Sequence, residues 1–185
     1  MNKLLAGALF AAAAASSGCS SFKKEAREAN PAPCPNVLVL SDAARALEFD
    51  GAQELVNIAY TAEITGLNIA CRYFGDEPID AEITIDMAFG KGPKGAEGEK
   101  HFKYFVAVTR KDLEVITKKE FVVAADFKGD KNLVFAEEEI DKIIIPRSND
   151  EISGINFEII VGLSLSAEQA IFNRSGKSLK FPDLK

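Results

Sequence analysis

Residues 79–89 read I-D-A-E-I-T-I-D-M-A-F, and this stretch decides the fold class. Its odd positions are all apolar, whereas its even positions are mostly acidic or hydroxyl-bearing. Successive side chains of a β-strand point to opposite faces, so a period of two predicts a strand with one buried face and one solvated face. The stretch therefore predicts a β-sheet protein.

A second alternating stretch precedes it. Residues 55–65 place apolar or aromatic side chains at the even positions, and residues 69–73 place them at the odd positions, Cys71 and Tyr73 among them. We therefore expect two strands, with residues 66–68 reversing the chain between them. Cys71 would face the core.

The later part of the chain repeats this pattern. Residues 102–109 are apolar at almost every position, which predicts a strand in the middle of a sheet. A tight turn at residues 110–112 joins it to residues 114–127 as a hairpin. Four more strands are expected at residues 37–40, 132–137, 140–145 and 155–165.

Strands at intervals of about ten residues, without long helices between them, indicate an all-β antiparallel sandwich. An immunoglobulin-like or fibronectin-like arrangement is our expectation, and a small closed barrel is the alternative. Ser166 and Gln169 have the spacing of a capping box, which predicts a short helix that Gly176 ends. A C-terminal tail is expected at residues 175–185, and residues 177–185 of it are expected to be frayed.

The first residues predict export. Lys3 is followed by an uncharged apolar run over residues 4–15 and by S-S-G-C at residues 16–19. The run is shorter than the roughly 20 residues that span a bilayer, so it predicts a removable signal rather than a membrane helix. The pattern is similar to bacterial lipoprotein signals, which implies that Cys19 receives a diacylglycerol and becomes the first residue.

Two details qualify this likeness. Ser16 stands where lipoprotein signals usually have a larger apolar residue, so ordinary secretory cleavage with a free Cys19 is the alternative. Ser20 and Ser21 follow the cysteine in place of an aspartate, which by the same likeness points to the outer membrane.

The predicted organisation is a signal peptide at residues 1–18, a lipidated tether at residues 19–35, a sandwich domain at residues 36–174 and the tail. The tether is rich in Ala, Lys, Glu, Ser and Pro, a composition typical of flexible linkers.

Cys34 and Cys71 remain once Cys19 is assigned to lipid. In an exported protein, an isolated cysteine pair most often forms a disulfide. A redox or metal-binding pair is the alternative, but the chain offers neither Cys-x-x-Cys spacing nor more than one histidine. We therefore predict a Cys34–Cys71 bridge.

The chain has a net charge of −6, so it lacks the basic balance of a nucleic-acid-binding protein. Residues 90–100 contain four glycines together with Lys91, Lys94 and Lys100. Backbone amides and lysines of such a loop can hold a polyanion, although the P-loop spacing is absent. These three lysines are the candidate ligand-binding residues, and a flexible hairpin loop is the alternative.

The remaining polar groups predict no catalytic or metal centre. His101 is the only histidine and lacks a second histidine as a partner. Asp80, Glu82 and Asp86 share one strand face, where a solvated surface is the simpler interpretation. The acidic run at residues 137–139 is typical of a sheet edge protected by charge. We expect no cofactor and no enzymatic activity.

Several segments of the body resemble small, functionally uncharacterised outer-membrane lipoproteins of proteobacteria. The segments that carry the resemblance are Cys34-Pro35, residues 62–67 leading into residues 71–73, residues 104–108, residues 167–169 and Asn173-Arg174. The likeness implies lipidation, the disulfide and a β domain, and it carries no activity.

These observations predict a non-enzymatic lipoprotein, anchored to the outer membrane through Cys19, that acts as a structural or protein-interaction module with an envelope protein partner. The alternative is a binding module for a small envelope lipid, glycan or polyanion.

Overall fold

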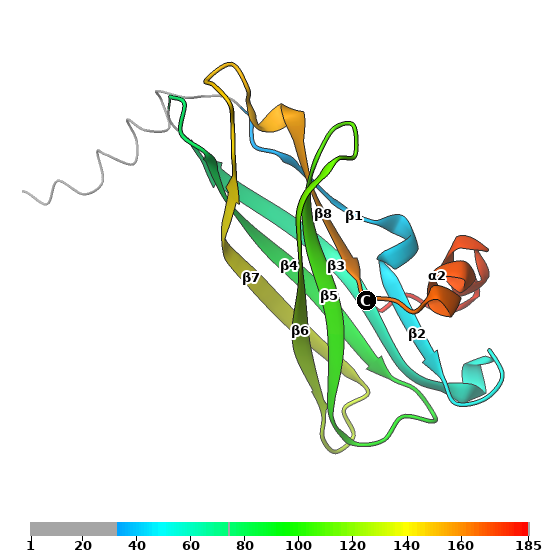
Figure 1. The fold of residues 1–185 in the computed structure, drawn as a ribbon. Helices are drawn as coiled ribbons and strands as arrows, with labels where there is room; N and C mark the ends of the chain where they lie inside the picture. Colours follow the sequence, from blue (N-terminus) through cyan, green and yellow to red (C-terminus); the bar gives the residue numbers. More distant parts are fainter. Residues whose placement is uncertain (1–32, 74, 185) are drawn as a thin grey trace, which may run out of the picture.

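A computed structural model describes residues 33–73 and 75–184, so the predicted signal peptide, Cys19 and most of the tether lie outside the described residues. The described chain forms two stacked four-stranded sheets (Figure 1). The strands are β1 (Asn36–Val39), β2 (Arg45–Phe49), β3 (Ile58–Arg72), β4 (Ile79–Lys91), β5 (Gly98–Arg110), β6 (Val115–Phe127), β7 (Leu133–Ile145) and β8 (Phe157–Leu163). The helical elements are α2 (Ala167–Arg174) and four single 3-10 turns, η1 (Ser41–Ala43), η2 (Leu55–Asn57), η3 (Gly154–Asn156) and η4 (Lys177–Lys180).

Sheet A has the strand order β1-β8-β5-β6, and sheet B has the order β2-β3-β4-β7. The predicted all-β sandwich is confirmed, and the two separate sheets exclude the closed barrel among the described residues. All strand pairs are antiparallel except β1 with β8, which is parallel. The immunoglobulin-like or fibronectin-like identity of the sandwich stays a prediction.

The two sides of the sandwich differ. On one side, β1 continues through η1 into β2, so the chain itself crosses from sheet A to sheet B. We call this the closed side. On the other side, β6 and β7 are the edge strands of the two sheets, joined by the short turn at residues 128–132. We call this the open side.

The core lies between the sheets, and the alternating stretch at residues 79–89 supplies much of it. Every odd position of residues 79–89 is buried, with exposed fractions of 0–1%. Sheet A contributes the facing side chains of β5 and β8, including Tyr104 and Phe157, both 0% exposed. Residues 102–109 lie in β5, between β8 and β6, so the predicted central strand and its hairpin with β6 are confirmed.

The predicted reversal at residues 66–68 is wrong, because β3 runs without interruption from Ile58 to Arg72. A β-bulge between Ile64 and Gly66 adds one residue to β3 relative to β4. Because of the extra residue, the inward-facing side chains change from even to odd positions along β3. In the sequence, this change looks like two separate strands. A Cβ atom at Gly66 would lie 2.4 Å from a carboxylate oxygen of Asp86, so a larger residue there would displace the Asp86 side chain.

The two predicted strands at residues 132–137 and 140–145 are likewise one strand, β7. The register between β4 and β7 shifts between Ala81 and Ile83, which pair with Ile143 and Ile140. One extra β7 residue again reverses the inward positions. The acidic run at residues 137–139 does lie on an edge strand, as predicted.

Ser166 caps α2 as the sequence indicated. Its hydroxyl accepts a hydrogen bond from the Gln169 amide at 3.2 Å, and the Gln169 side chain accepts one from the Ser166 amide at 2.9 Å. Gly176 follows the helix with a φ of 74°, a conformation that glycine adopts at little cost.

Candidate functional site

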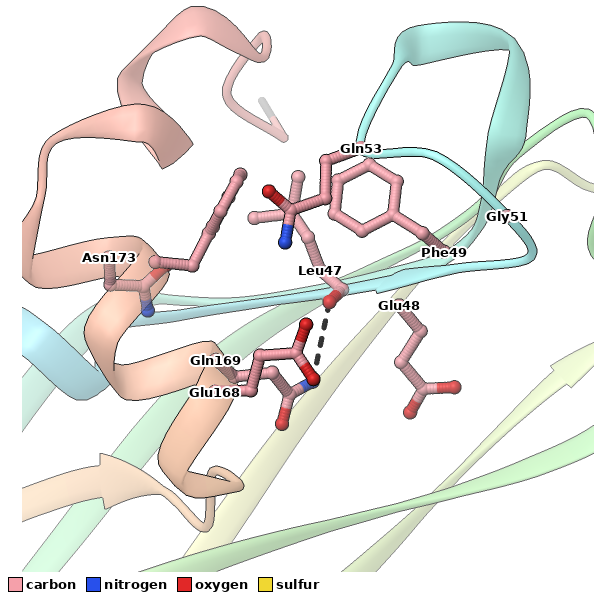
Figure 2. A pocket seen from close by; sticks show the side chains of 9 residues that line it. Leu47, Glu48, Phe49, Gly51, Gln53, Glu168, Gln169 and Asn173 are labelled. Atoms are coloured by element: carbon pink, nitrogen blue, oxygen red, sulfur yellow. Dashed lines mark hydrogen bonds between the residues drawn. The ribbon is translucent and has the colours of Figure 1, made fainter.

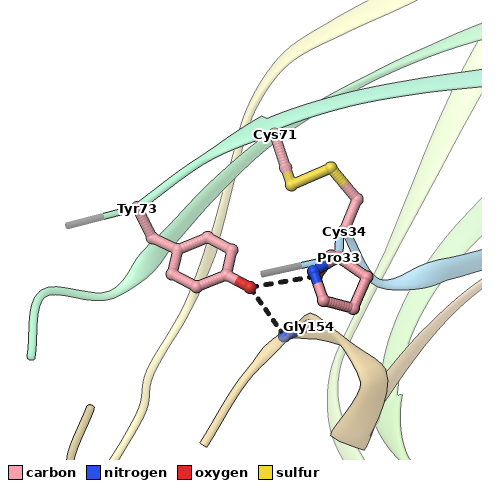
Figure 3. The surroundings of a disulfide bond; sticks show 5 residues. All are labelled: Pro33, Cys34, Cys71, Tyr73 and Gly154. Carbon is pink, nitrogen blue, oxygen red and sulfur yellow. Dashed lines mark hydrogen bonds between the residues drawn. A yellow bond between two sulfur atoms is a disulfide. The ribbon is translucent and has the colours of Figure 1, made fainter. Parts of the chain in front are cut away.

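The Cys34–Cys71 disulfide is present and lies on the closed side, with a Cα–Cα distance of 5.6 Å (Figure 3). It joins the residue that leads into β1 of sheet A to β3 of sheet B. The point at which the chain enters the domain is thereby covalently linked to both sheets.

A tyrosine reinforces this junction. The Tyr73 hydroxyl donates to the Pro33 carbonyl at 3.0 Å and accepts from the Gly154 amide at 3.3 Å (Figure 3). A side chain at Gly154 would collide with this segment, since a Cβ atom would lie 2.3 Å from the Pro33 carbonyl oxygen. The Arg147 guanidinium carbon lies 4.6 Å from the centre of the Tyr73 ring, and its nitrogens donate to the carbonyls of Gly75, Glu77 and Ile152. The sequence pattern gave no sign that Arg147 or Gly154 has this role.

The far end of the sandwich contains a hollow of about 340 Å³ between β2 and α2 (Figure 2). Its apolar lining is Leu47, Phe49 and Phe172. Its polar lining comes from β2, the chain after it and α2, namely Glu48, Gln53, Glu168, Gln169 and Asn173, with Gly51 in the turn.

The amide side chains of this lining hold α2 on β2. The Gln169 side chain donates to the Leu47 carbonyl at 3.3 Å, and the Asn173 side chain donates to the carbonyls of Asp42 and Arg45 at 2.9 and 2.7 Å. These groups therefore fix the shape of the hollow. Since β3 rises about 3.3 Å per residue, the hollow lies roughly 40 Å from Cys71.

The closing residues are packed against the domain, so the predicted fraying of residues 177–185 is wrong for the described part. Phe181 is 8% exposed and lies with Phe49 and Phe172 in a cluster whose ring centroids are 5.4–6.0 Å apart. Arg45 donates to the carbonyls of Ser178 and Phe181, and it forms ion pairs with Glu63 and Asp183. A charged residue next to a strand start carries no sequence signal for such a contact.

A second hollow, of about 230 Å³, shares Glu48 and Gln169 with the first and reaches β5 and the end of β8. Its other lining residues are Ala46, His101, Phe102, Lys103, Leu163 and Ser164. His101 is 60% exposed at its side chain and lies 3.3 Å from Glu99. No second histidine exists in the chain to complete a typical metal or catalytic site with it.

The structure separates the three candidate lysines by their surroundings. The Lys100 ammonium lies 2.7 Å from Glu48 and 4.9 Å from the centre of the Tyr60 ring, so it already has an anionic partner and an aromatic one. Lys91 ends β4 and is half-buried, whereas Lys94 is exposed. The ligand-binding role of these residues stays a prediction.

The loop that carries them is shorter and more strongly held than predicted. Strand β4 ends at Lys91 and strand β5 begins at Gly98, so the loop between them is residues 92–97. The Gly92 and Lys94 amides donate to β3 carbonyls at 2.9 Å, and Tyr60 bonds both backbone groups of Ala96 at 3.0 Å. These amides are therefore occupied within the protein, unlike those of a phosphate-binding loop.

The carboxylates of β4 lie on the outer face of sheet B, as predicted. Asp80 forms an ion pair with Arg72 at 3.0 Å. Asp141 and then Glu82, which is hydrogen-bonded to Glu139, raise the pKa of the Glu139 carboxyl. Within the described ranges, no group of three histidine, cysteine, aspartate or glutamate residues is arranged to hold a metal ion.

One member of the acidic run differs from its neighbours. The Tyr104 hydroxyl donates to the Glu138 carboxylate at 3.1 Å, so Glu138 of sheet B faces inward toward sheet A on the open side. Burial first, and then the charge of Glu138, raise the pKa of the Tyr104 hydroxyl well above its usual range. The sequence pattern missed this pair, because its three consecutive glutamates suggest only an exposed edge.

The chain matches no protein-family model, no curated protein and no solved structure. Among residues 33–73 and 75–184, no helix has the length and apolar character required to span a bilayer.

Proposed function

We propose that this protein is a non-enzymatic lipoprotein of the bacterial cell envelope, anchored to the outer membrane through Cys19, whose sandwich is a structural or protein-interaction module. The observation that carries the proposal is the Cys34–Cys71 disulfide at the entry to the domain. Disulfides form and persist in oxidising compartments, which agrees with the export signal at residues 1–19.

The position of the disulfide suits an anchored domain. The proposed tether, residues 19–35, contains Cys34 of the bridge near its end, so a force applied through the membrane anchor would reach both sheets. Diacylglycerol and further acyl chains at about 0.8 kcal/mol per buried methylene would hold the chain on a bilayer.

The anchor is tested by growing cells with labelled palmitate and fractionating their membranes. The native chain is expected to carry the label in the outer membrane, and Cys19→Ser is expected to lose both the label and the membrane association. The matched control is Ser20→Ala, which keeps the cysteine and should behave as the native chain. A native chain without label would overturn the location.

A second candidate function is binding of a small envelope lipid, glycan or polyanion, and the hollow of about 340 Å³ favours it. The Lys100 ammonium forms an ion pair with Glu48, which lines this hollow, so one of the three candidate lysines lies beside it. Vesicles of anionic phospholipid, with zwitterionic vesicles as the comparison, provide the probe for a Cys19→Ser chain. Replacing Lys91, Lys94 and Lys100 with alanine should weaken binding to the anionic vesicles, and unchanged binding would refute this role.

A further inference from the structure

Strand β6 has an edge that the fold leaves accessible. It pairs with β5 along its whole length, from Val115 to Phe127, and has no second strand partner in the part of the chain that the structure describes. Residues 117–127 contain no proline and pair with β5 without a bulge. A long, regular edge presents unpaired N–H and C=O groups that can accept another strand.

Two exposed apolar residues lie near the centre of this edge, and a third, Val115, lies at its start. Val122 is 55% exposed, and Ala124 beside it on the same face is also exposed. The other outward side chains are Lys118, Glu120 and Asp126, which pair with the outward residues of β5. The edge therefore has an apolar centre with a cation toward one end and an anion toward the other.

We propose that β6 pairs antiparallel with β6 of a second copy of this chain, about a two-fold axis at Val122. This axis places Val122 opposite its own equivalent and Lys118 opposite Asp126 of the second copy, twice. Glu120 then lies opposite Ala124. Opposite charges facing each other on neighbouring strands stabilise a sheet, and like charges destabilise it.

Most neighbouring registers lack this complementarity; an axis at Ala124 would place Glu120 opposite Lys128, but it would also place Val122 opposite Asp126. An axis at Glu120 would place that carboxylate opposite itself. An axis at Phe121 would place Lys118 opposite Ala124 and give no ion pair. An axis at Val123 would place Lys118 opposite Lys128 and Glu120 opposite Asp126.

The surroundings of Asp126 favour an additional cation. Asp126 pairs in register with Glu99 of β5, so two carboxylates lie side by side on the outer face of sheet A. Lys128 reaches Asp126 at 2.6 Å, and Glu99 contacts His101. The Lys118 ammonium lies 4.3 Å from the centre of the Phe105 ring. Because Lys118 is exposed, its ammonium can turn toward the second copy.

The other edges are less suited to self-pairing. Strands β1 and β2 have only four and five residues. Strand β7 carries Glu137, Glu139 and Asp141 on its outward face, where a second copy would bring like charges together. Among the strands described, β6 is therefore the edge that a second copy fits.

Cysteine pairing tests the register directly on the full chain purified from membranes. Residues directly opposite in antiparallel strands have Cα atoms about 4.5–5.5 Å apart, which is within disulfide range. Val122→Cys should therefore form a disulfide-linked dimer on mild oxidation. Ala124→Cys is the matched control, because its opposite residue is Glu120, and it should form no disulfide-linked dimer under the same oxidation.

Charge exchange tests the same pairing without cysteines. Sedimentation in detergent should give a dimer for the native chain and a monomer for Lys118→Asp and for Asp126→Lys, with the dimer restored when both changes are combined. Circular dichroism checks that each variant is folded. Equal crosslinking at Val122 and Ala124, or a double exchange that stays monomeric, would overturn the proposal.

Pairing through β6 rests on the proposed interaction role and gives it a partner. The membrane anchor and the β6 pairing can be tested separately. Cys19→Ser should lose the anchor and keep the β6 pairing. A monomeric Cys19→Ser chain beside a dimeric native chain would show that the membrane, and not the strand edge, brings the copies together, which contradicts the proposal.

Discussion

The closed side and the open side of the sandwich are stabilised in different ways. On the closed side, the two sheets are joined by the chain itself, by the Cys34–Cys71 disulfide, by the Glu48–Lys100 ion pair and by the contacts of Tyr73. On the open side, the turn at residues 128–132 connects the two edge strands at one end, and the Tyr104–Glu138 hydrogen bond links β5 to the edge strand β7. The difference suggests that the closed side stabilises the fold and leaves the open side accessible to a partner.

The largest loss of stability is expected from removing the disulfide. In Cys34→Ser/Cys71→Ser, the unfolded chain gains the freedom of a loop with a sequence separation of 37, so the free energy of unfolding should fall by about 4 kcal/mol. Denaturant unfolding measures the change. A reducing agent should lower the stability of the native chain similarly and leave the double variant unaffected; a native chain insensitive to reduction would count against this role.

Phe172→Ala should have the next largest effect. The ring is 7% exposed and packs against Phe49 and Phe181, so its loss should lower the free energy of unfolding by about 3 kcal/mol. Ile171 precedes it on the same helix and is 67% exposed, so Ile171→Ala should change stability little. Similar losses in the two variants, measured by denaturant unfolding, would show that this cluster does not hold the helix.

Tyr73→Phe tests the polar part of the closed side. The change removes only the hydroxyl, leaving the Gly154 amide and the Pro33 carbonyl without this partner, and should cost about 2 kcal/mol in thermal or denaturant unfolding. Tyr60→Phe also removes a hydroxyl, but one whose hydrogen bonds are exposed, so its cost should be smaller. A larger loss of stability in Tyr60→Phe than in Tyr73→Phe would show that the Tyr73 hydroxyl does not stabilise the closed side.

The open side should respond to alkaline pH. Because the pKa of Tyr104 is raised in the folded state, the unfolded state releases this proton first as the pH increases. The stabilisation is therefore complete below the unfolded pKa of about 10 and decreases above it, by about 1.4 kcal/mol per pH unit. Tyr104→Phe should show a smaller decrease between pH 9 and about 11 in denaturant titrations, and an unchanged slope would refute the assignment.

The smallest effect is expected at the Glu48–Lys100 pair, whose side chains are 37% and 30% exposed. Ion pairs near water contribute little, so Glu48→Gln should lower the free energy of unfolding by less than about 1 kcal/mol. Measuring the native chain and the variant at low and high salt checks the cause, because the difference between them should shrink as salt screens the charges. A difference that persists in high salt would indicate packing instead.

The sequence predicted the features that repeat and missed those that interrupt a repeat. The alternation in residues 79–89, the hairpin after residues 102–109 and the Ser166 cap are all confirmed. The bulges in β3 and β7 each switch the inward-facing side chains between even and odd positions. In the sequence, this switch looks the same as a turn between two separate strands. The disulfide could be predicted because only Cys34 and Cys71 remain for pairing once Cys19 is assigned to lipid.

The contacts that fix the ends of the domain had no comparable signal. Arg45 and Arg147 act through backbone carbonyls that any residue could supply, so their roles depend on the folded path of the chain. Tyr104 and Glu138 lie on strands of different sheets and far apart in the sequence. A local sequence pattern therefore cannot predict their contact.

A photocrosslinking residue placed in the native chain in intact cells tests most directly whether the open side is the interaction surface of an anchored envelope protein. Val122 on the open side and Leu40 on the closed side are both exposed, at 55% and 41%. We expect a photocrosslinker at position 122 to capture a second copy of this chain as its protein partner. We expect one at position 40 to capture no protein. Capture from position 40 alone, or equally from both positions, would contradict this account.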